Sequence, residues 1–352
     1  MSGDLHDFAA RVVAWQKHHG RHDLPWQETS DPYRVWLSEV MLQQTQVATV
    51  RTYFTRFVER FPDVWQLAVA TQDEVLGLWS GLGYYSRARN LHLCAQQVVT
   101  QYHGQFPRRA EELQTLPGIG RSTAAAIASL CFGERVAILD ANVKRVVTRV
   151  LGFDADLAQA VNERALWEAA GGLLPAQRVA RTSMMDYTQG MMDLGALVCL
   201  PKKPLCTTCP VLQQCRAAES GEPQRYPVRT RTLKRSSQSL WLLWLRGADG
   251  SVWLYKRPPT GVWAGLYCMP VFDSDHELRE ALPVQLQKRL RMQPAFRHVL
   301  THKDLHLHPC VIDLHQGQRA EWGEGRWFSA AQWPALGLPA PIRALLEAPG
   351  GA

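Results

Sequence analysis

The chain has 352 residues, of which 46% are hydrophobic and 20% charged, and its formal net charge is +7. This composition is ordinary for a globular protein and excludes a disordered one. The length exceeds what one small core needs, so we expect two domains. The positive charge permits nucleic-acid binding but does not require it.

The N-terminal region carries no predicted targeting segment. Asp4, Asp7, Arg11 and Lys17 interrupt residues 1–20, which excludes the apolar core of a secretory signal. No stretch reaches the ~18 consecutive apolar residues of a membrane span. We therefore expect a cytoplasmic protein with no membrane partner, in which cysteines stay reduced.

The first two-thirds of the chain show helical patterns joined by short turns that contain Gly or Pro. Leu5, Phe8, Val12 and Trp15 have helical spacing. A second helix is predicted to begin after Asp31, a preferred cap residue, and to run to about residue 44. Further helices are expected at residues 73–79, 86–102, 110–116, 122–132, 141–150 and 157–170. Because strand patterns are nearly absent here, this region is predicted to be mainly α.

The pattern changes after residue 224. Residues 225–235 contain Arg and Lys but no acidic residue, which is more typical of a solvated linker than of a dedicated phosphate site. Beyond it, strands are predicted at residues 239–245, 251–255 and 305–314, and a helix at 278–290. The tail is therefore predicted to be a separate α+β domain.

Four of the eight cysteines lie close together in the sequence, at Cys199, Cys206, Cys209 and Cys215. In a reducing compartment, four thiolates at this spacing predict a metal site. The site could be tetrahedral zinc or an iron–sulfur cluster. The spacing alone does not decide between them, and zinc is the commoner case.

Residues 116–120 read Leu-Pro-Gly-Ile-Gly and lie between two helical patterns. Gly118 and Gly120 let the backbone approach a ligand closely, and the following helix offers free N–H donors. This pattern predicts a helix–hairpin–helix that holds a DNA phosphate, although a Gly-x-Gly turn also serves as a plain connector.

Two carboxylates are candidates for catalysis. Asp140 precedes an apolar helix, where an aspartate is also the preferred N-cap. Glu39 has apolar helical neighbours, so partial desolvation would raise its pKa and suit it to general acid work. The alternative for Glu39 is a solvated position on an amphipathic helix. The next residues, Leu42, Gln43 and Gln44, suit either insertion into a duplex or core packing.

Together these features resemble the helix–hairpin–helix DNA glycosylase superfamily and, within its iron–sulfur branch, the MutY-type adenine DNA glycosylases. The resemblance covers almost the whole chain. Its motifs are residues 24–26, 36–45, 81–85, 116–120, 139–143 and 191–195. The cysteine spacing matches the family's cluster loop, so the resemblance implies one 4Fe–4S cluster held by the four cysteines rather than zinc.

The resemblance also implies the domain organisation. Residues 1–224 would form a helical catalytic region, with a six-helix module at about 30–135 and a cluster module from the N-terminal helix and about 136–224. Residues 225–237 would be the basic linker. Residues 238–346 would form a Nudix-like lesion-recognition domain.

Site roles follow from the same resemblance. Glu39 matches the family's catalytic glutamate and Asp140 its catalytic aspartate, while Tyr84, Ser122 and Asn142 match residues that shape or support the adenine pocket. The implied DNA-binding residues are Leu42, Gln43, Gln44, Gly118, Gly120 and Lys144.

Ser122 separates this chain from the similar endonuclease III-like enzymes. Those enzymes place a lysine two residues past the second hairpin glycine, where its amine forms a Schiff base with the sugar. A hydroxyl cannot form an imine. We therefore expect a monofunctional glycosylase that does not cleave the strand.

The tail resembles the Nudix-like C-terminal domain of the same family at residues 261–267 and 296–298. Val271 stands where the first glutamate of a Nudix metal box would be, so the domain is expected to bind rather than hydrolyse. The family's Phe-Ser-His loop senses 8-oxoguanine. This chain has Leu300, Thr301 and His302 there, and the resemblance implies lesion recognition by Thr301 and His302.

The predicted function is removal of adenine mispaired with 8-oxoguanine, or with guanine, by a monomer that acts on double-stranded DNA. The alternatives are an endonuclease III-like pyrimidine or thymine glycosylase and a non-catalytic iron–sulfur DNA-binding protein. A third alternative is a nucleotide hydrolase whose active site lies in the C-terminal domain. The absence of the glutamates of a Nudix metal box argues against it.

Overall fold

The computed structural model describes residues 5–27, 29–176, 181–230, 234–315 and 324–348. The chain forms two compact units. The first comprises Met1–Val69 and Leu93–Thr232, and the second comprises Ala70–His92 and Leu233–Ala352. Each unit has a hydrophobic core of its own. None of the described helices is both long and apolar enough to cross a bilayer.

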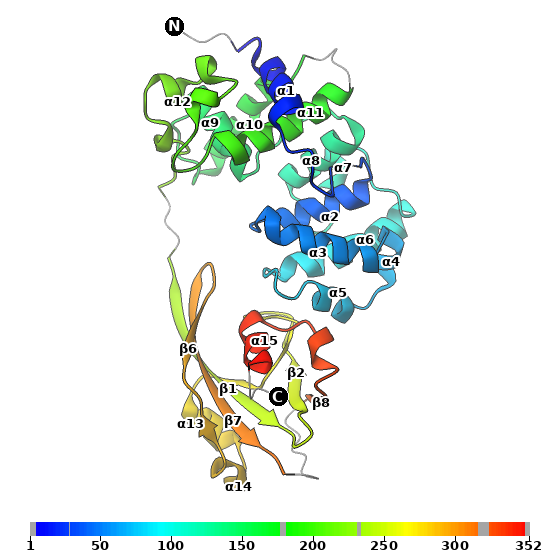
Figure 1. Ribbon diagram of the computed structural model, residues 1–352, viewed down its shortest axis with the longest axis vertical. Helices are drawn as coiled ribbons and strands as arrows, with labels where there is room; N and C mark the ends of the chain where they lie inside the picture. Colours follow the sequence, from blue (N-terminus) through cyan, green and yellow to red (C-terminus); the bar gives the residue numbers. More distant parts are fainter. Residues whose placement is uncertain (1–4, 28, 177–180, 231–233, 316–323, 349–352) are drawn as a thin grey trace. The chain divides into compact units, whose positions relative to one another are not determined.

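The first unit is helical, as the sequence predicts (Figure 1). Its helices are α1 (Phe8–His19), α2 (Pro32–Leu42), α3 (Val47–Arg60), α4 (Val64–Val69), α7 (Ala110–Leu113), α8 (Arg121–Phe132), α9 (Ala141–Leu151), α10 (Ala160–Gly172), α11 (Arg181–Asp193) and α12 (Arg216–Glu219). A π-helical turn, η1 (Leu194–Val198), continues α11, and the single-turn 3₁₀ helices η2 (Cys206–Thr208), η3 (Leu212–Gln214) and η4 (Pro223–Arg225) follow. Helix α6 (Ser86–Tyr102) passes from the second unit into the first.

Local sequence signals explain where these helices begin and end. The Asp31 side chain accepts a hydrogen bond from the Tyr33 N–H at 3.0 Å, and α2 begins directly after Asp31, at Pro32. Helix α2 ends at Leu42, before the predicted residue 44, because Gln43 leaves the helical conformation and Gln44 has a left-handed φ of 57°. The predicted helix at 110–116 is shortened to α7, and the sequence patterns missed α3, α4 and α11.

Helices α1 and α11 pack closely in the core of the first unit. A Cβ atom at Gly190 would lie 2.9 Å from Val12 Cγ1 and 3.0 Å from Gln16 Cβ. Near the end of this contact the fully buried Asp193 accepts hydrogen bonds from the Arg21 backbone N–H (2.9 Å) and Nε (2.7 Å). The N-terminal helix is thus fixed to the segment that leads into the cysteines.

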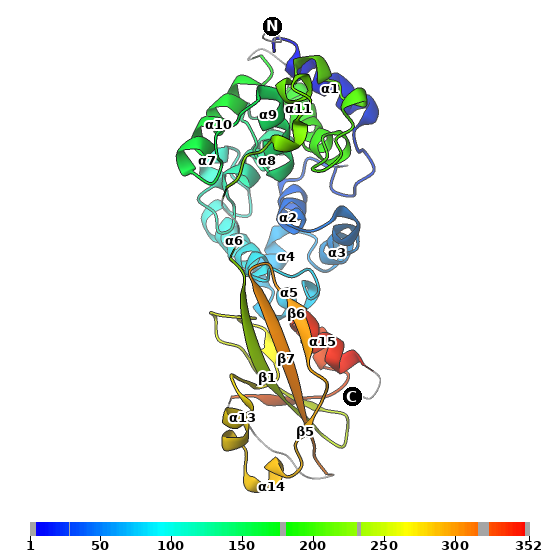
Figure 2. The same cartoon turned by 90° about the vertical axis from the view of Figure 1, so that its left-hand side faces the viewer.

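The second unit is built on a mixed sheet (Figures 1 and 2). Its strands are β1 (Ser236–Arg246), β2 (Val252–Lys256), β3 (Tyr267–Cys268), β4 (Val271–Phe272), β5 (Arg291–Met292), β6 (Phe296–Val299), β7 (Lys303–Asp313) and β8 (Arg326–Phe328). The main path runs β3-β2-β1-β7-β5. The long strands β1 and β7 are parallel and in register from Ser236–Lys303 to Arg246–Asp313, whereas the other pairs are antiparallel.

Side chains alternate across β1 and separate two apolar layers. Leu240 and Leu242 pack in one cluster with α15 (Ala340–Glu347), and Leu243 and Leu245 pack in the other with α13 (Asp275–Ala281). The expected α+β tail is therefore confirmed. The prediction of a single helix at 278–290 is wrong, because α13 ends before Pro283 and a second helix, α14 (Val284–Gln287), begins after it. A proline cannot continue the hydrogen-bond ladder of a helix, so the chain restarts there.

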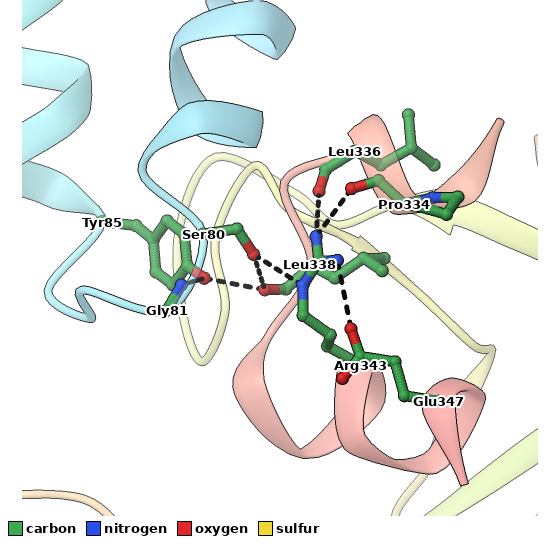
Figure 3. A network of polar contacts seen from close by, with 8 residues as sticks. All are labelled: Ser80, Gly81, Tyr85, Pro334, Leu336, Leu338, Arg343 and Glu347. Atoms are coloured by element: carbon green, nitrogen blue, oxygen red, sulfur yellow. Dashed lines mark hydrogen bonds and ion pairs between the residues drawn. The ribbon is translucent and has the colours of Figure 1, made fainter. Parts of the chain in front are cut away.

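Residues Ala70–His92 are part of the second unit although they lie far from it in sequence. They include α5 (Gln72–Leu78) and the turn before α6. The Leu338 carbonyl accepts hydrogen bonds from Tyr85 Oη (2.7 Å) and Ser80 Oγ (3.3 Å), and Arg343 Nε donates to Ser80 Oγ at 3.1 Å (Figure 3). Nothing in the local sequence pattern indicated this long-range packing.

The α1–α11 contact predicts opposite effects for one substitution at two helical glycines. Gly190→Ala should lower the free energy of unfolding by about 1–3 kcal/mol, because the added methyl overpacks a close helix crossing. Gly171→Ala in α10 should be neutral or stabilising by up to about 1 kcal/mol, because no neighbouring atom lies within 4 Å of its added Cβ and alanine favours helix. Thermal unfolding followed by far-ultraviolet circular dichroism measures both. Equal shifts for the two variants would contradict the close contact.

Candidate active site

A cavity of about 670 Å³ opens in the first unit between α2, α11 and the start of α9. Glu39 from α2 and Asp140 and Asn142 from the start of α9 line it. Leu42 also lines the cavity. The two carboxylates that the sequence singled out separately therefore face one cavity, although about 100 residues separate them in the chain.

Glu39 lies in the more desolvating environment of the two. Burial raises the pKa of Glu39 to about 7, and the negative charge of Asp140 adds to this rise. The carboxyl group is then protonated in a large fraction of molecules near neutral pH. It can therefore act as a proton donor at the pH at which most enzymes work.

Burial and the groups around Asp140 act on its pKa in opposite directions. Burial is the larger effect and raises the pKa of Asp140, while hydrogen bonds from the Val143 and Asn142 N–H groups and the charges of Arg145 and Lys144 offset part of the rise. The Val143 N–H donates to Oδ1 at 2.7 Å. Asp140 is thus the N-cap of α9 and also a carboxylate on the cavity wall, so its role as a cap does not exclude a catalytic one.

The residues that follow the hairpin hold the backbone next to Asp140. Ser122 Oγ accepts a hydrogen bond from the N–H of Leu139 at 3.3 Å, next to Asp140 in the chain. Gly120 is the N-cap of α8, and a Cβ atom there would meet no other atom within 4 Å. The start of α8 is therefore open to a ligand. Gly118 has a φ of 75°, which its tight turn requires.

The remaining predicted DNA-binding residues differ in their environments. Gln43 Nε2 donates to Thr123 Oγ1 at 3.3 Å, whereas the exposed Gln44 follows the end of α2 in a left-handed conformation. The Lys144 side chain, only 18% exposed, forms an ion pair with Glu163 through its ammonium group. A phosphate contact by Lys144 would therefore have to compete with this carboxylate.

Helix α9 connects Asp140 to the cysteine loop through two arginines. Arg145 donates to the carbonyl oxygens of Cys199 and Gly195, both at 2.7 Å, and to Asn142 Oδ1 at 2.9 Å. One turn later, the buried Arg149 donates to the carbonyl oxygen of Leu200 at 2.7 Å.

The sulfur of Cys199 also faces Arg149, with Nη1 and Sγ 3.3 Å apart. Sequence reasoning missed both arginines. The available signal was their position, i and i+4, on a helix whose other faces are rich in valine.

The four predicted metal-ligating cysteines surround one small cavity together with Arg149. None of the four forms a disulfide. Burial raises the pKa of the Cys209 thiol, and the charges of Cys199, Cys206 and Cys215 contribute to the rise, so the four lie within electrostatic reach of one another. Across the described part of the chain, no three His, Cys, Asp or Glu side chains are placed to hold a single ion.

Thr301 and His302 line a second cavity, of about 760 Å³, within the second unit. Tyr84 lines the same cavity, and its hydroxyl lies 2.5 Å from Thr301 Oγ1. The sequence-based prediction placed Tyr84 with the adenine pocket. In the structure Tyr84 lies beside the two residues predicted to recognise the lesion, and Trp263 and His298 also line this cavity.

Comparisons with known proteins agree with this architecture. Residues 37–170 match the model of the HhH-GPD superfamily of base excision DNA repair proteins, and residues 241–348 match that of the NUDIX domain. The chain is 32% identical over 348 residues to the adenine DNA glycosylase of Buchnera aphidicola subsp. Schizaphis graminum, and the alignment covers 97% of this chain and 99% of the relative. It is 35% identical over 389 residues to the adenine DNA glycosylase of Mus musculus, and that alignment covers 93% of this chain and 74% of the relative.

Solved structures show the same fold for the helical part. A thermostable thymine-DNA glycosylase superposes with a TM-score of 0.53 at 29% identity, over 60% of this chain and 95% of that one. A non-covalent endonuclease III–DNA complex superposes with a TM-score of 0.51 at 22% identity, over 63% and 98%. With relatives matched over nearly their full length and both domain models present, the chain belongs to the adenine DNA glycosylase family of base-excision repair enzymes.

Proposed function

We propose that this enzyme hydrolyses the N-glycosidic bond of adenine mispaired with 8-oxoguanine, or with guanine, in double-stranded DNA and leaves the strand intact. The observation that carries the proposal is the pair of carboxylates in one cavity, where burial raises the pKa of Glu39 to about 7 and N–H groups of α9 donate to Asp140. The names of the curated relatives support adenine as the base.

The chemistry follows from this pair. Adenine must leave the base stack before its sugar bond can be reached, and a cavity of about 670 Å³ is within the usual size range for a small-molecule site. Glu39 gives its proton to N7 of the flipped adenine, and the C1′–N9 bond breaks with its electron pair going to the base. Asp140 stabilises the positive charge that develops on the sugar. Water then adds to C1′ and gives a proton to the Glu39 carboxylate, which restores the acid.

Ser122 supports the monofunctional assignment. Its hydroxyl holds the backbone next to Asp140 and carries no amine that could attack the sugar. Lys17 also lines the cavity, but its ammonium lies 3.7 Å from the Asp186 carboxylate in an exposed ion pair. The catalytic groups of the cavity are therefore an acid and an anion rather than a nucleophilic amine.

We assign one 4Fe–4S cluster to Cys199, Cys206, Cys209 and Cys215. Soft thiolates arranged around a shared cavity suit a multi-iron cluster, whereas no group of donors among the described residues converges on a single ion. When bound, the cluster supplies four iron–thiolate bonds that cross-link the loop. Arg149 then joins this loop to the helix that begins at Asp140.

Lesion recognition is proposed for the second cavity. Thr301 and His302, with Tyr84, would distinguish 8-oxoguanine, whose N7–H and C8 carbonyl replace the bare N7 and C8–H of guanine. In this proposal residues 238–346 form the lesion-recognition domain, with which residues Ala70–His92 of the catalytic region 1–224 pack, and residues 225–237 join the domain to that region. The enzyme acts as a cytoplasmic, DNA-associated monomer.

The first test is base release from duplexes that place each of the four bases opposite 8-oxoguanine or guanine. Wild-type protein should release adenine alone and leave the strand uncut until alkali is added. Glu39→Gln should bind the same duplexes and release adenine about 10²–10⁴-fold more slowly, because the amide cannot donate the proton. Release of thymine, or strand cleavage trapped by borohydride, would contradict the proposal.

The raised pKa of Glu39 predicts the pH dependence of the chemical step. Because the acid form is the active one, the single-turnover rate constant should fall as the pH rises through about 7. Duplex affinity measured at each pH separates this effect from weaker binding. A rate constant that stays constant from about pH 6 to about pH 9 would exclude Glu39 as the acid.

The cluster assignment predicts the iron content. Protein purified without oxygen should contain about four irons per chain, together with the broad visible absorption of a cluster. Cys215→Ser should lower the iron content, whereas Cys131→Ala, a buried cysteine of α8, should retain it. Stoichiometric zinc in place of iron would overturn the assignment.

A further inference from the structure

The loop that carries Thr301 joins β6 to β7 and differs in sequence from the loop that the resemblance leads us to expect. The parallel register of the sheet places Ser236, the first residue of β1, opposite Lys303. Arg235, directly before β1, therefore lies beside this loop. The Ser236 N–H donates to the His302 carbonyl at 3.1 Å and extends the sheet contact by one step.

Arg235 contacts the loop with three hydrogen bonds. Nη1 donates to the Thr301 carbonyl at 2.9 Å, and Nη2 donates to the Leu300 carbonyl at 2.9 Å and to Asp304 Oδ1 at 2.7 Å. The planar guanidinium presents its donors in a fixed fork, so one side chain fixes the direction of two successive carbonyl groups. The Arg235 hydrogen bond also keeps the pKa of Asp304 below its usual range, so the pair stays ionised at neutral pH.

The carbonyl groups that Arg235 holds belong to Thr301 and to the residue before it. With the backbone fixed, the Thr301 hydroxyl lies 2.5 Å from the Tyr84 hydroxyl. The Tyr84 side of this contact is also anchored, because the neighbouring Ser80 and Tyr85 bond to the Leu338 carbonyl (Figure 3). Both hydroxyl groups are thus positioned before any ligand binds, which lowers the ordering cost of recognition.

We propose that Arg235 is a positioning residue for lesion recognition, which acts through Thr301 and is held in place by Asp304. The inference rests on the proposed recognition of 8-oxoguanine by the second cavity. A threonine hydroxyl that is already oriented can accept a hydrogen bond from N7–H of 8-oxoguanine and finds no such donor on guanine. Arg235 therefore contributes to the preference between the two partner bases rather than to the breaking of the adenine bond.

A general electrostatic role is the competing explanation. Arg235 ends a basic segment, and any cation near DNA strengthens binding through the phosphates without regard to the base. Arg229 lies in the same segment, is exposed and provides the matched control. A phosphate role predicts that the two arginines behave alike, whereas the positioning role predicts that only Arg235 changes the partner-base preference.

The experiment measures single-turnover adenine release opposite 8-oxoguanine and opposite guanine for full-length wild type, Arg235→Ala, Arg235→Lys and Arg229→Ala. We expect Arg235→Ala to reduce the 8-oxoguanine preference about tenfold, mainly by slowing the 8-oxoguanine duplex. Arg235→Lys should restore only part of the preference, because an ammonium cannot hold two carbonyls and a carboxylate in the same fork. Arg229→Ala should keep the wild-type ratio.

A double-mutant cycle with Thr301→Ala tests whether Arg235 acts through Thr301. The combined variant should lose no more preference than Thr301→Ala alone, because coupled residues are not additive. Additive losses, full restoration by lysine, or an unchanged ratio in Arg235→Ala would each overturn the inference. Wild-type protein that releases no adenine would instead refute the proposed function. Unfolding midpoints equal to wild type confirm that each variant is folded.

Discussion

The burial of Arg145 and Arg149 in α9 is the constraint on which the catalytic half of the molecule depends. A buried guanidinium is tolerated only when acceptors satisfy its donors. Here carbonyl groups of the chain leading into the cysteine loop satisfy them, from Gly195 to Leu200. The loop must therefore adopt one path past α9, and α9 in turn places Asp140 at the cavity. Close approach is needed as well, since a Cβ at Gly195 would lie 2.6 Å from Asn142 Cβ.

The same helix sets the electrostatics of the carboxylate pair. Free N–H groups at its start stabilise the anion of Asp140, and the ionised Asp140 then makes ionisation of Glu39 more costly. One helix terminus thus separates the two titrations: it lowers the cost of a charge on one residue and raises it on the other. Two carboxyl groups in one cavity are thereby given different environments, and different environments suit two such groups to different roles.

The sequence predicted those parts of the molecule that depend on neighbours close in the chain. Caps such as Asp31, the alternation along β1 and the clustered cysteines are local signals, and the structure has the corresponding elements. That Glu39 and Asp140 belong to one site was predicted from the family resemblance and not from the helical periodicity. The contact of Tyr84 with Thr301 was not predicted, because Thr301 lies more than 200 residues away and no local pattern reports such a contact.

The place of residues Ala70–His92 has a consequence for how substitutions act on this chain. The backbone passes between the two units after Val69, after His92 and again after Thr232. The first two crossings lie inside residues 37–170, the part that matches the glycosylase family model, so a segment of the glycosylase sequence forms part of the second unit. Substitutions at Ser80 or Tyr85 therefore act on the C-terminal part of the chain, where Leu338 and Arg343 bond to them, as well as on the helical part.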